Sequence, residues 1–98
     1  MKLTKITDGS SLTLKIEGWL DTTTAPELYK TVKTELEGIT DLIFDMSELS
    51  YISSAGLRVL LSAQKIMNKQ GRMTVTNICE SVSEVFKMTG FDRLLNIE

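Results

Sequence analysis

The 98-residue sequence predicts a single small α/β domain with a mixed sheet, and three observations support this fold class. Segments with the two-residue alternation of strands are interleaved with segments that have helical spacing. An Asp8-Gly9 pair after the first strand is typical of an antiparallel hairpin. The later strands are joined through helices, which favours parallel pairs with right-handed crossovers. The expected order is strand, strand, helix, strand, helix, strand, helix and a last short strand.

The N-terminal part contains the hairpin and the first helix. A strand is expected over residues 2–7, and a second one follows, in which three apolar residues alternate with polar ones. These apolar residues are Leu12, Leu14 and Ile16. Asp21 ends this strand. Thr24 is a candidate N-cap of the following helix, and Glu27 can reach back to it as in a capping box. Pro26 suits the first turn of this helix. Gly38 ends the helix.

The middle of the chain is expected to hold a buried strand, a loop and a second helix. The unbroken apolar run of residues 42–44 suits a central strand that is buried on both faces. Residues 45–52 are interpreted as the loop that delivers Ser53 and Ser54 to a helix over residues 55–70. The core line of this helix comprises Gly56, Leu60, Ala63 and Met67. One flank holds Leu57, Leu61, Gln64 and Asn68, and it is either the edge of the core or half of a partner surface.

The C-terminal part repeats the pattern on a smaller scale. A strand is expected over residues 72–77, after Gly71. Val82, Val85 and Phe86 mark a short helix that ends at Gly90. Residues 91–97 are expected to form a last short strand or a packed tail.

Composition excludes several functional classes. The net charge of −2 gives no reason to expect binding to nucleic acid or to an anionic membrane. The longest apolar runs are too short to span a bilayer, and the chain starts with a strand-like pattern rather than a signal peptide, so the cytoplasm is the simplest location. The absence of histidine rules out Ser-His and Cys-His pairs, and no metal cluster or phosphate-binding glycine loop is present. Cys79, the only cysteine, is expected to be a small buried hydrophobic residue.

Two loops are expected to meet at one end of the sheet, because loops after the C-terminal ends of parallel strands gather there. They span residues 21–24 and 45–54. Ser54 has two interpretations. In the first, it only caps the following helix. In the second, its hydroxyl is in addition presented for modification, because the N-terminus of a helix accepts the negative charge of a phosphate. Asp21 and Asp45 are expected to bond turn amides, and a catalytic carboxylate pair is the least favoured alternative.

Two motifs carry a resemblance to a known family. They are Asp45-Met46-Ser47 followed by Tyr51-Ile52-Ser53-Ser54-Ala55-Gly56-Leu57, and Gly18-Trp19-Leu20-Asp21 with the residues up to Leu28. Together they resemble the bacterial anti-sigma-factor antagonists, the small single-domain members of the STAS group, along residues 1–98. The resemblance implies the STAS fold and places a phosphorylated serine at Ser54, with Ser53 as the second candidate. Many family members have aspartate and Ser or Thr around the acceptor, where this chain has Ser53 and Ala55.

The resemblance also implies a function. The unphosphorylated protein would bind an anti-sigma factor that is also a serine kinase, which releases a sigma factor, and a serine phosphatase would reset the switch. No cofactor or metal is implied, and the protein would not be an enzyme. The expected partner-binding residues are Asp21, Thr22, Ser53, Ser54, Leu57, Arg58 and Leu61, with Asp45 holding the acceptor loop. The alternatives are a STAS binding module of another signalling or transport complex, and a small enzyme that uses Asp21, Asp45 and Ser54.

Overall fold

A four-stranded sheet with the strand order β1-β2-β3-β4 organises the protein, and the computed structural model describes all 98 residues of it. The strands are β1 (Lys2–Asp8), β2 (Ser11–Leu20), β3 (Asp41–Ile52) and β4 (Arg72–Thr76). The helices are α1 (Ala25–Glu35), α2 (Ser54–Met67), α3 (Glu80–Thr89) and a short 3₁₀ turn, η1 (Phe91–Arg93). β1 pairs antiparallel with β2, whereas β2–β3 and β3–β4 are parallel pairs. The predicted mixed α/β fold is therefore confirmed.

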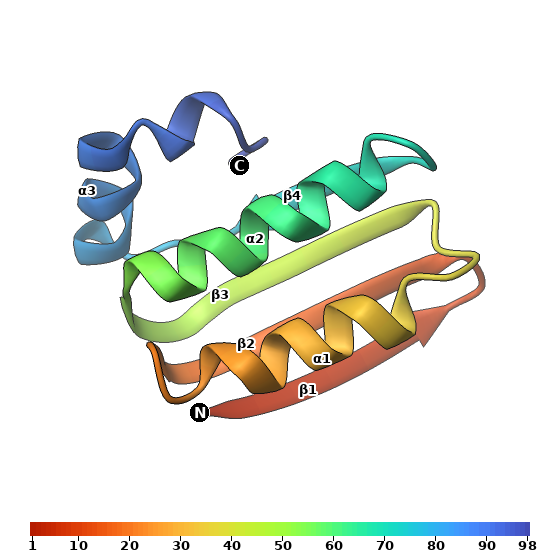
Figure 1. Cartoon of the computed structure of the whole chain (residues 1–98), viewed down its shortest axis with the longest axis horizontal. Coiled ribbons are helices and arrows are strands. Elements are labelled where there is room, and N and C mark those ends of the chain that lie inside the picture. The colour runs from red at the N-terminus through yellow and green to blue at the C-terminus, as the bar shows by residue number, and fades with distance from the viewer.

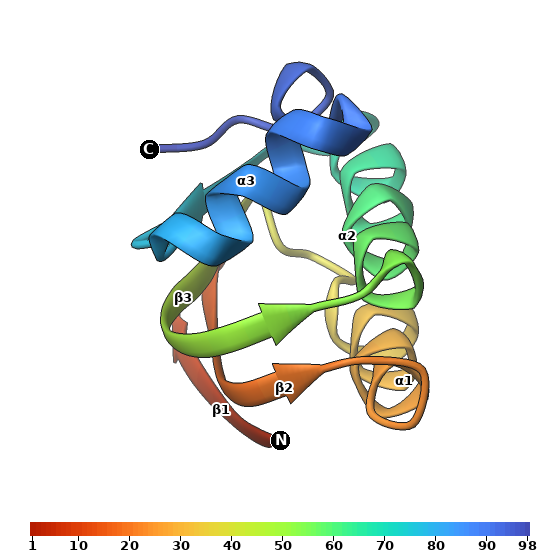
Figure 2. The same cartoon turned by 90° about the vertical axis from the view of Figure 1, so that its left-hand side faces the viewer.

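The helices cover one face of the sheet and leave much of the other open. α1 and α2 lie side by side along the strands (Figure 1), and the sheet lies on one side of both in the turned view (Figure 2). α3 lies at the end of the molecule where β3 finishes and α2 begins (Figures 1 and 2). The alternation predicted for β2 is confirmed, since Leu12, Leu14 and Ile16 are all buried toward the helices.

The third strand is longer than the sequence predicts. Residues 45–52 were expected to form a loop, but β3 continues through them to Ile52. Pairing with β2 shifts register twice along this stretch, so the buried residues after Met46 are Leu49 and Ile52, three positions apart instead of two. Because of these irregularities, the sequence of this stretch lacks the two-residue alternation that predicts a strand. Ile43 is only half-buried, so the expected burial of this strand on both faces is also wrong.

The C-terminal elements confirm the predicted end of α3, decide between the two alternatives for the tail and correct the prediction for Cys79. α3 ends at Gly90, whose φ of 79° is the left-handed conformation that favours glycine at a helix C-terminus. Residues 91–97 contain η1 and a single bridge between Ile97 and Val75, which is a packed tail rather than a strand. Cys79 is half-buried at the N-cap of α3, with its sulfur 3.2 Å from the Ser81 hydroxyl, so it is not the buried hydrophobic residue expected.

Gly56 joins the start of α2 to the ends of β2 and β3. A Cβ atom at this position would lie 2.7 Å from Leu20 Cγ and 2.9 Å from Ile52 Cγ1, closer than carbon atoms pack. Gly56 is buried, together with Leu60, Ala63 and Met67, so the predicted core line of α2 is confirmed. The absence of a side chain at Gly56 therefore lets the first turn of the helix approach both strands.

We expect Gly56→Leu to destabilise the fold strongly. Overpacking typically costs about 1–3 kcal/mol, and two of the three closest atoms, Leu20 Cγ and Ile52 Cγ1, lie at branch or inner positions of buried side chains. Gly56→Ala should cost less in the same direction. Chemical denaturation of both variants measures the effect, with Lys65→Leu on the exposed face of α2 as the control. Unchanged unfolding free energies for both Gly56 variants would show that the packing differs from this description.

Candidate functional site

The carboxyl ends of β2 and β3 bring two segments together. Leu20 is the register partner of Ile52, and the Ser53 amide donates a hydrogen bond to the Leu20 carbonyl at 2.9 Å. The loop over residues 21–24, which leads into α1, therefore starts beside the first turn of α2. The predicted proximity of the segments that carry Asp21 and Ser54 is confirmed by this pairing.

The two serines differ sharply in their surroundings. Ser53, with φ −103° and ψ 175°, is the N-cap of α2, and Ser54 is the first helical residue, so the prediction that Ser54 caps the helix is wrong by one position. Ser54 is exposed. The Ser53 hydroxyl oxygen is buried and has no hydrogen-bond partner. Leu57 makes the first amide bond of the helix, to the Ser53 carbonyl at 3.0 Å, so the amides ahead of it lie at the positive end of the helix dipole.

Asp21 organises the loop between β2 and α1. Its carboxylate accepts hydrogen bonds from the Thr23 hydroxyl at 2.7 Å, the Thr23 amide at 3.0 Å and the Thr24 amide at 3.2 Å. These bonds, that of the Thr23 hydroxyl above all, hold the pKa of Asp21 below its usual value. The expectation that Asp21 bonds turn amides is confirmed.

Thr24 does not cap α1 with its side chain, so the predicted capping box is wrong. Its hydroxyl points back into the loop, where it donates to the Trp19 carbonyl at 2.9 Å and accepts from the Asp21 amide at 2.8 Å. The Asp21 carboxylate and carbonyl bond the amides of Thr24 and Ala25 instead, which leaves the cap role to Asp21.

Asp45 lies in the middle of β3, opposite Lys15, and not beside Asp21. Its carboxylate accepts from the Ser47 amide at 3.0 Å and from Asn77 Nδ2 at 3.3 Å, and the Ser47 bond is the main cause of its lowered pKa. At ~3.3 Å per residue, the stretch from Asp45 to Ile52 spans roughly 20 Å. Asp45 therefore neither holds the acceptor loop nor forms a carboxylate pair with Asp21, and both ideas are wrong.

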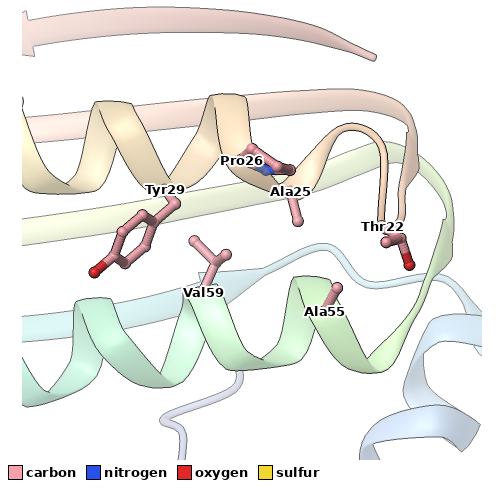
Figure 3. Close-up of a pocket in the computed structure, with 6 residues that line it drawn as sticks. All are labelled: Thr22, Ala25, Pro26, Tyr29, Ala55 and Val59. Carbon is pink, nitrogen blue, oxygen red and sulfur yellow. The ribbon is translucent and has the colours of Figure 1, made fainter.

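A groove lies between α1 and α2, and Ala55, the residue after Ser54, is part of its lining. Its volume is about 260 Å³, and mostly apolar side chains from the first turns of the two helices line it (Figure 3). The lining residues are Thr22, Ala25, Pro26, Tyr29, Ala55 and Val59. The sequence analysis missed this groove, although the small residues Ala25 and Ala55 at both helix starts were a visible signal. Only the packing of the two helices shows that these turns face each other.

The expected partner-binding residues divide into surface and core positions. Thr22 and Arg58 are exposed, and Leu61 is half-buried. Leu57 is only 2% exposed and belongs to the hydrophobic core, so its expected contact with a partner is wrong. α2 buries a wider arc than the line through Gly56, and this arc includes the flank that carries Leu57.

No group of three or more His, Cys, Asp or Glu side chains is placed to hold a metal ion. No helix has the length and apolar character needed to cross a membrane.

Comparisons with known proteins agree with this geometry. The model of the STAS domain family matches residues 2–98. The chain is 33% identical over 93 residues to BtrV of Bordetella bronchiseptica, assigned as an anti-sigma factor antagonist, with 93% of this chain and 80% of BtrV covered. It is 26% identical to the anti-sigma-B factor antagonist of Staphylococcus epidermidis, with 99% and 92% covered. Unphosphorylated SpoIIAA, an anti-sigma factor antagonist, superposes with a TM-score of 0.74 at 17% identity, covering 95% and 97%.

The chain therefore belongs to the STAS domain family, as the two sequence motifs predicted. Its relatives are antagonists of anti-sigma factors. Such antagonists are binding proteins rather than enzymes. The likeness to SpoIIAA shows the shared fold, because the sequence identity is low.

Acidification should weaken the fold partly through Asp21. Its folded-state pKa is lowered, so its contribution to stability is fully present above the unfolded-state pKa, near 3.9, and is lost as the pH falls through the folded-state value. Thermal melts at pH 7 and at pH 3 should show a smaller pH-dependent loss of Tm in Asp21→Asn than in the parent. Asp92→Asn, at an exposed position of η1, is the control. An equal loss in parent and Asp21→Asn would show that the loop network does not stabilise the charged form.

Proposed function

We propose that this protein is an anti-sigma factor antagonist whose binding is switched by phosphorylation of Ser54. The observation that carries the proposal is the position of Ser54, which is exposed on the first residue of α2 and directly precedes Ala55 in the lining of an apolar groove. Membership of the STAS family and the relatives that antagonise anti-sigma factors support it. SpoIIAA, which has the same fold, has been solved in phosphorylated and unphosphorylated forms.

The chemistry of a helix start suits a phosphate on Ser54. The phosphate adds roughly −1.5 to −2 charges at neutral pH. The amides ahead of Leu57 and the positive end of the helix dipole stabilise negative charge at this place. Phosphorylation can therefore leave the fold intact. In a protein interface, however, the same charge must be desolvated and repels acidic groups, so it opposes binding.

The proposed partner surface combines the groove with the exposed residues around it. The groove offers apolar area that a side chain of the partner can bury, with Tyr29 and Val59 on its walls. Thr22, which is exposed, and Asp21, which is half-buried, belong to the β2–α1 loop, and the exposed Ser54 and Arg58 belong to α2. Placing the acceptor next to this apolar area makes the interface sensitive to charge at Ser54.

The proposed cycle has two states. The unphosphorylated protein binds an anti-sigma factor that is also a serine kinase, and a sigma factor is released in the cytoplasm. The kinase then transfers phosphate from ATP to Ser54, the complex dissociates, and a serine phosphatase restores the binding form. Ser53 is the weaker acceptor candidate, because its hydroxyl oxygen is buried and a kinase needs access to it.

Substitutions at Ser54 should separate binding from stability. Ser54→Ala should bind the cognate anti-sigma factor like the parent and resist phosphorylation. Ser54→Asp should bind at least tenfold more weakly, while its charge at the helix start leaves stability unchanged or raises it by about 0.3–1 kcal/mol. Calorimetric titration and thermal melts measure the two effects. Ser81→Asp, in the first turn of α3, is the matched control for a charge at a helix start. Equal binding by both Ser54 variants would refute the switch.

Arg58 should contribute to partner binding and little to stability. It is exposed and lies one turn after Ser54 on α2. We expect Arg58→Glu to weaken the affinity for the anti-sigma factor while the unfolding free energy stays within roughly ±0.5 kcal/mol. Lys65→Glu, two turns further along the same helix, makes the same charge change away from the proposed surface. If both variants lose equal affinity, the effect is one of net charge and Arg58 is not at the interface.

A further inference from the structure

Two large aromatic side chains lie exposed on the sheet. Trp19 is 62% exposed and Tyr51 is 48% exposed, although both belong to inner strands. They are register partners across β2 and β3, with ring centroids 6.0 Å apart and planes inclined by 58°. The separation of the two rings is within the range of roughly 4.5–7 Å that is typical of aromatic pairs.

The pair faces away from the helices. Strand alternation puts Trp19 on the face opposite Leu20, and Tyr51 on the face opposite Ile52, and both of these neighbours are buried under α2. Figure 2 shows α1 and α2 on one side of the ends of β2 and β3, and α3 above the end of β3. The aromatic surface is therefore distinct from the groove between the helices.

Two carboxylates lie on the same face of the sheet, next to the aromatic pair. Glu17 lies two residues before Trp19 in β2, and therefore on the same face, and its register partner in β3 is the exposed Glu48. Like charges directly opposite each other weaken a sheet, so the fold itself gains nothing from this pair. The only ion pair to either of them joins Glu17 to Lys2 at 4.0 Å, and the Lys2 side chain is 76% exposed, so this pair is weak.

We propose that the Trp19–Tyr51 surface, with Glu17 and Glu48, binds an arginine or lysine side chain from a basic segment of a protein partner. A cation over the face of tryptophan or tyrosine is attracted by the ring, and the neighbouring carboxylates supply the opposite charge. The negative charges disfavour nucleic acid and anionic lipid. The surface and the groove lie on opposite faces of the sheet, so a second partner can bind here whether or not the groove is filled.

The protein carries its own probe, because Trp19 is its only tryptophan. Titration of the full chain with a capped peptide that contains two arginines should change the Trp19 emission saturably. A peptide of the same length with two glutamates should not. Glu17→Gln with Glu48→Gln should weaken the arginine peptide about fivefold or more. Glu37→Gln with Glu84→Gln removes two exposed charges elsewhere and should change the affinity less than twofold.

A second variant tests the aromatic part. Tyr51→Leu keeps apolar bulk but removes the ring, and it should weaken the arginine peptide roughly two- to fivefold, which corresponds to a cation–π contact of about 0.5–1 kcal/mol at an exposed site. Thermal melts verify that each variant is folded. An unchanged Trp19 emission in the parent would overturn the proposal. Equal losses in the two double glutamine variants would overturn it as well, because they would show non-specific attraction to net charge.

Discussion

The contact of Gly56 with Leu20 and Ile52 is the constraint on which the site depends. Because Gly56 has no side chain, the first turn of α2 packs against the ends of β2 and β3 at the point where these strands pair. That approach sets the start of α2 beside the Asp21 loop and leaves Ser54 exposed at the corner between them. A bulkier residue would push the helix away and separate the two segments.

The local polar groups then divide into those that build the loop and those that remain free. Asp21 Oδ1 and the Thr24 hydroxyl form hydrogen bonds within the β2–α1 connection. Ser54 is not committed to any such bond, and Ser53 carries the cap position with a buried, unpaired hydroxyl. A rigid loop beside an uncommitted hydroxyl is what a modification switch requires, because the charge changes while the scaffold stays.

Sequence patterns predicted the order of the elements, the hairpin, the core line of α2 and the meeting of the Asp21 and Ser54 segments, because hydrophobic period and turn residues determine these locally. The sequence patterns failed where irregular pairing between strands breaks the two-residue alternation by which a strand is predicted. Because of the register shifts between β2 and β3, residues 45–52 were predicted to be a loop rather than part of a strand. The prediction of a loop also placed Asp45 too close to the site. Leu57 and the groove depend on how α2 rotates and packs against α1, which no local pattern encodes.

The most direct test of the phosphate switch is to map the modified residue. The protein is incubated with the cognate anti-sigma factor kinase and ATP, and phosphopeptides are then sequenced by mass spectrometry. The account predicts a single phosphate on Ser54, because its hydroxyl is exposed at the start of α2 whereas the Ser53 oxygen is buried. Phosphate on Ser53 or on a threonine of the 22–24 loop, or none at all with an active kinase, would contradict it.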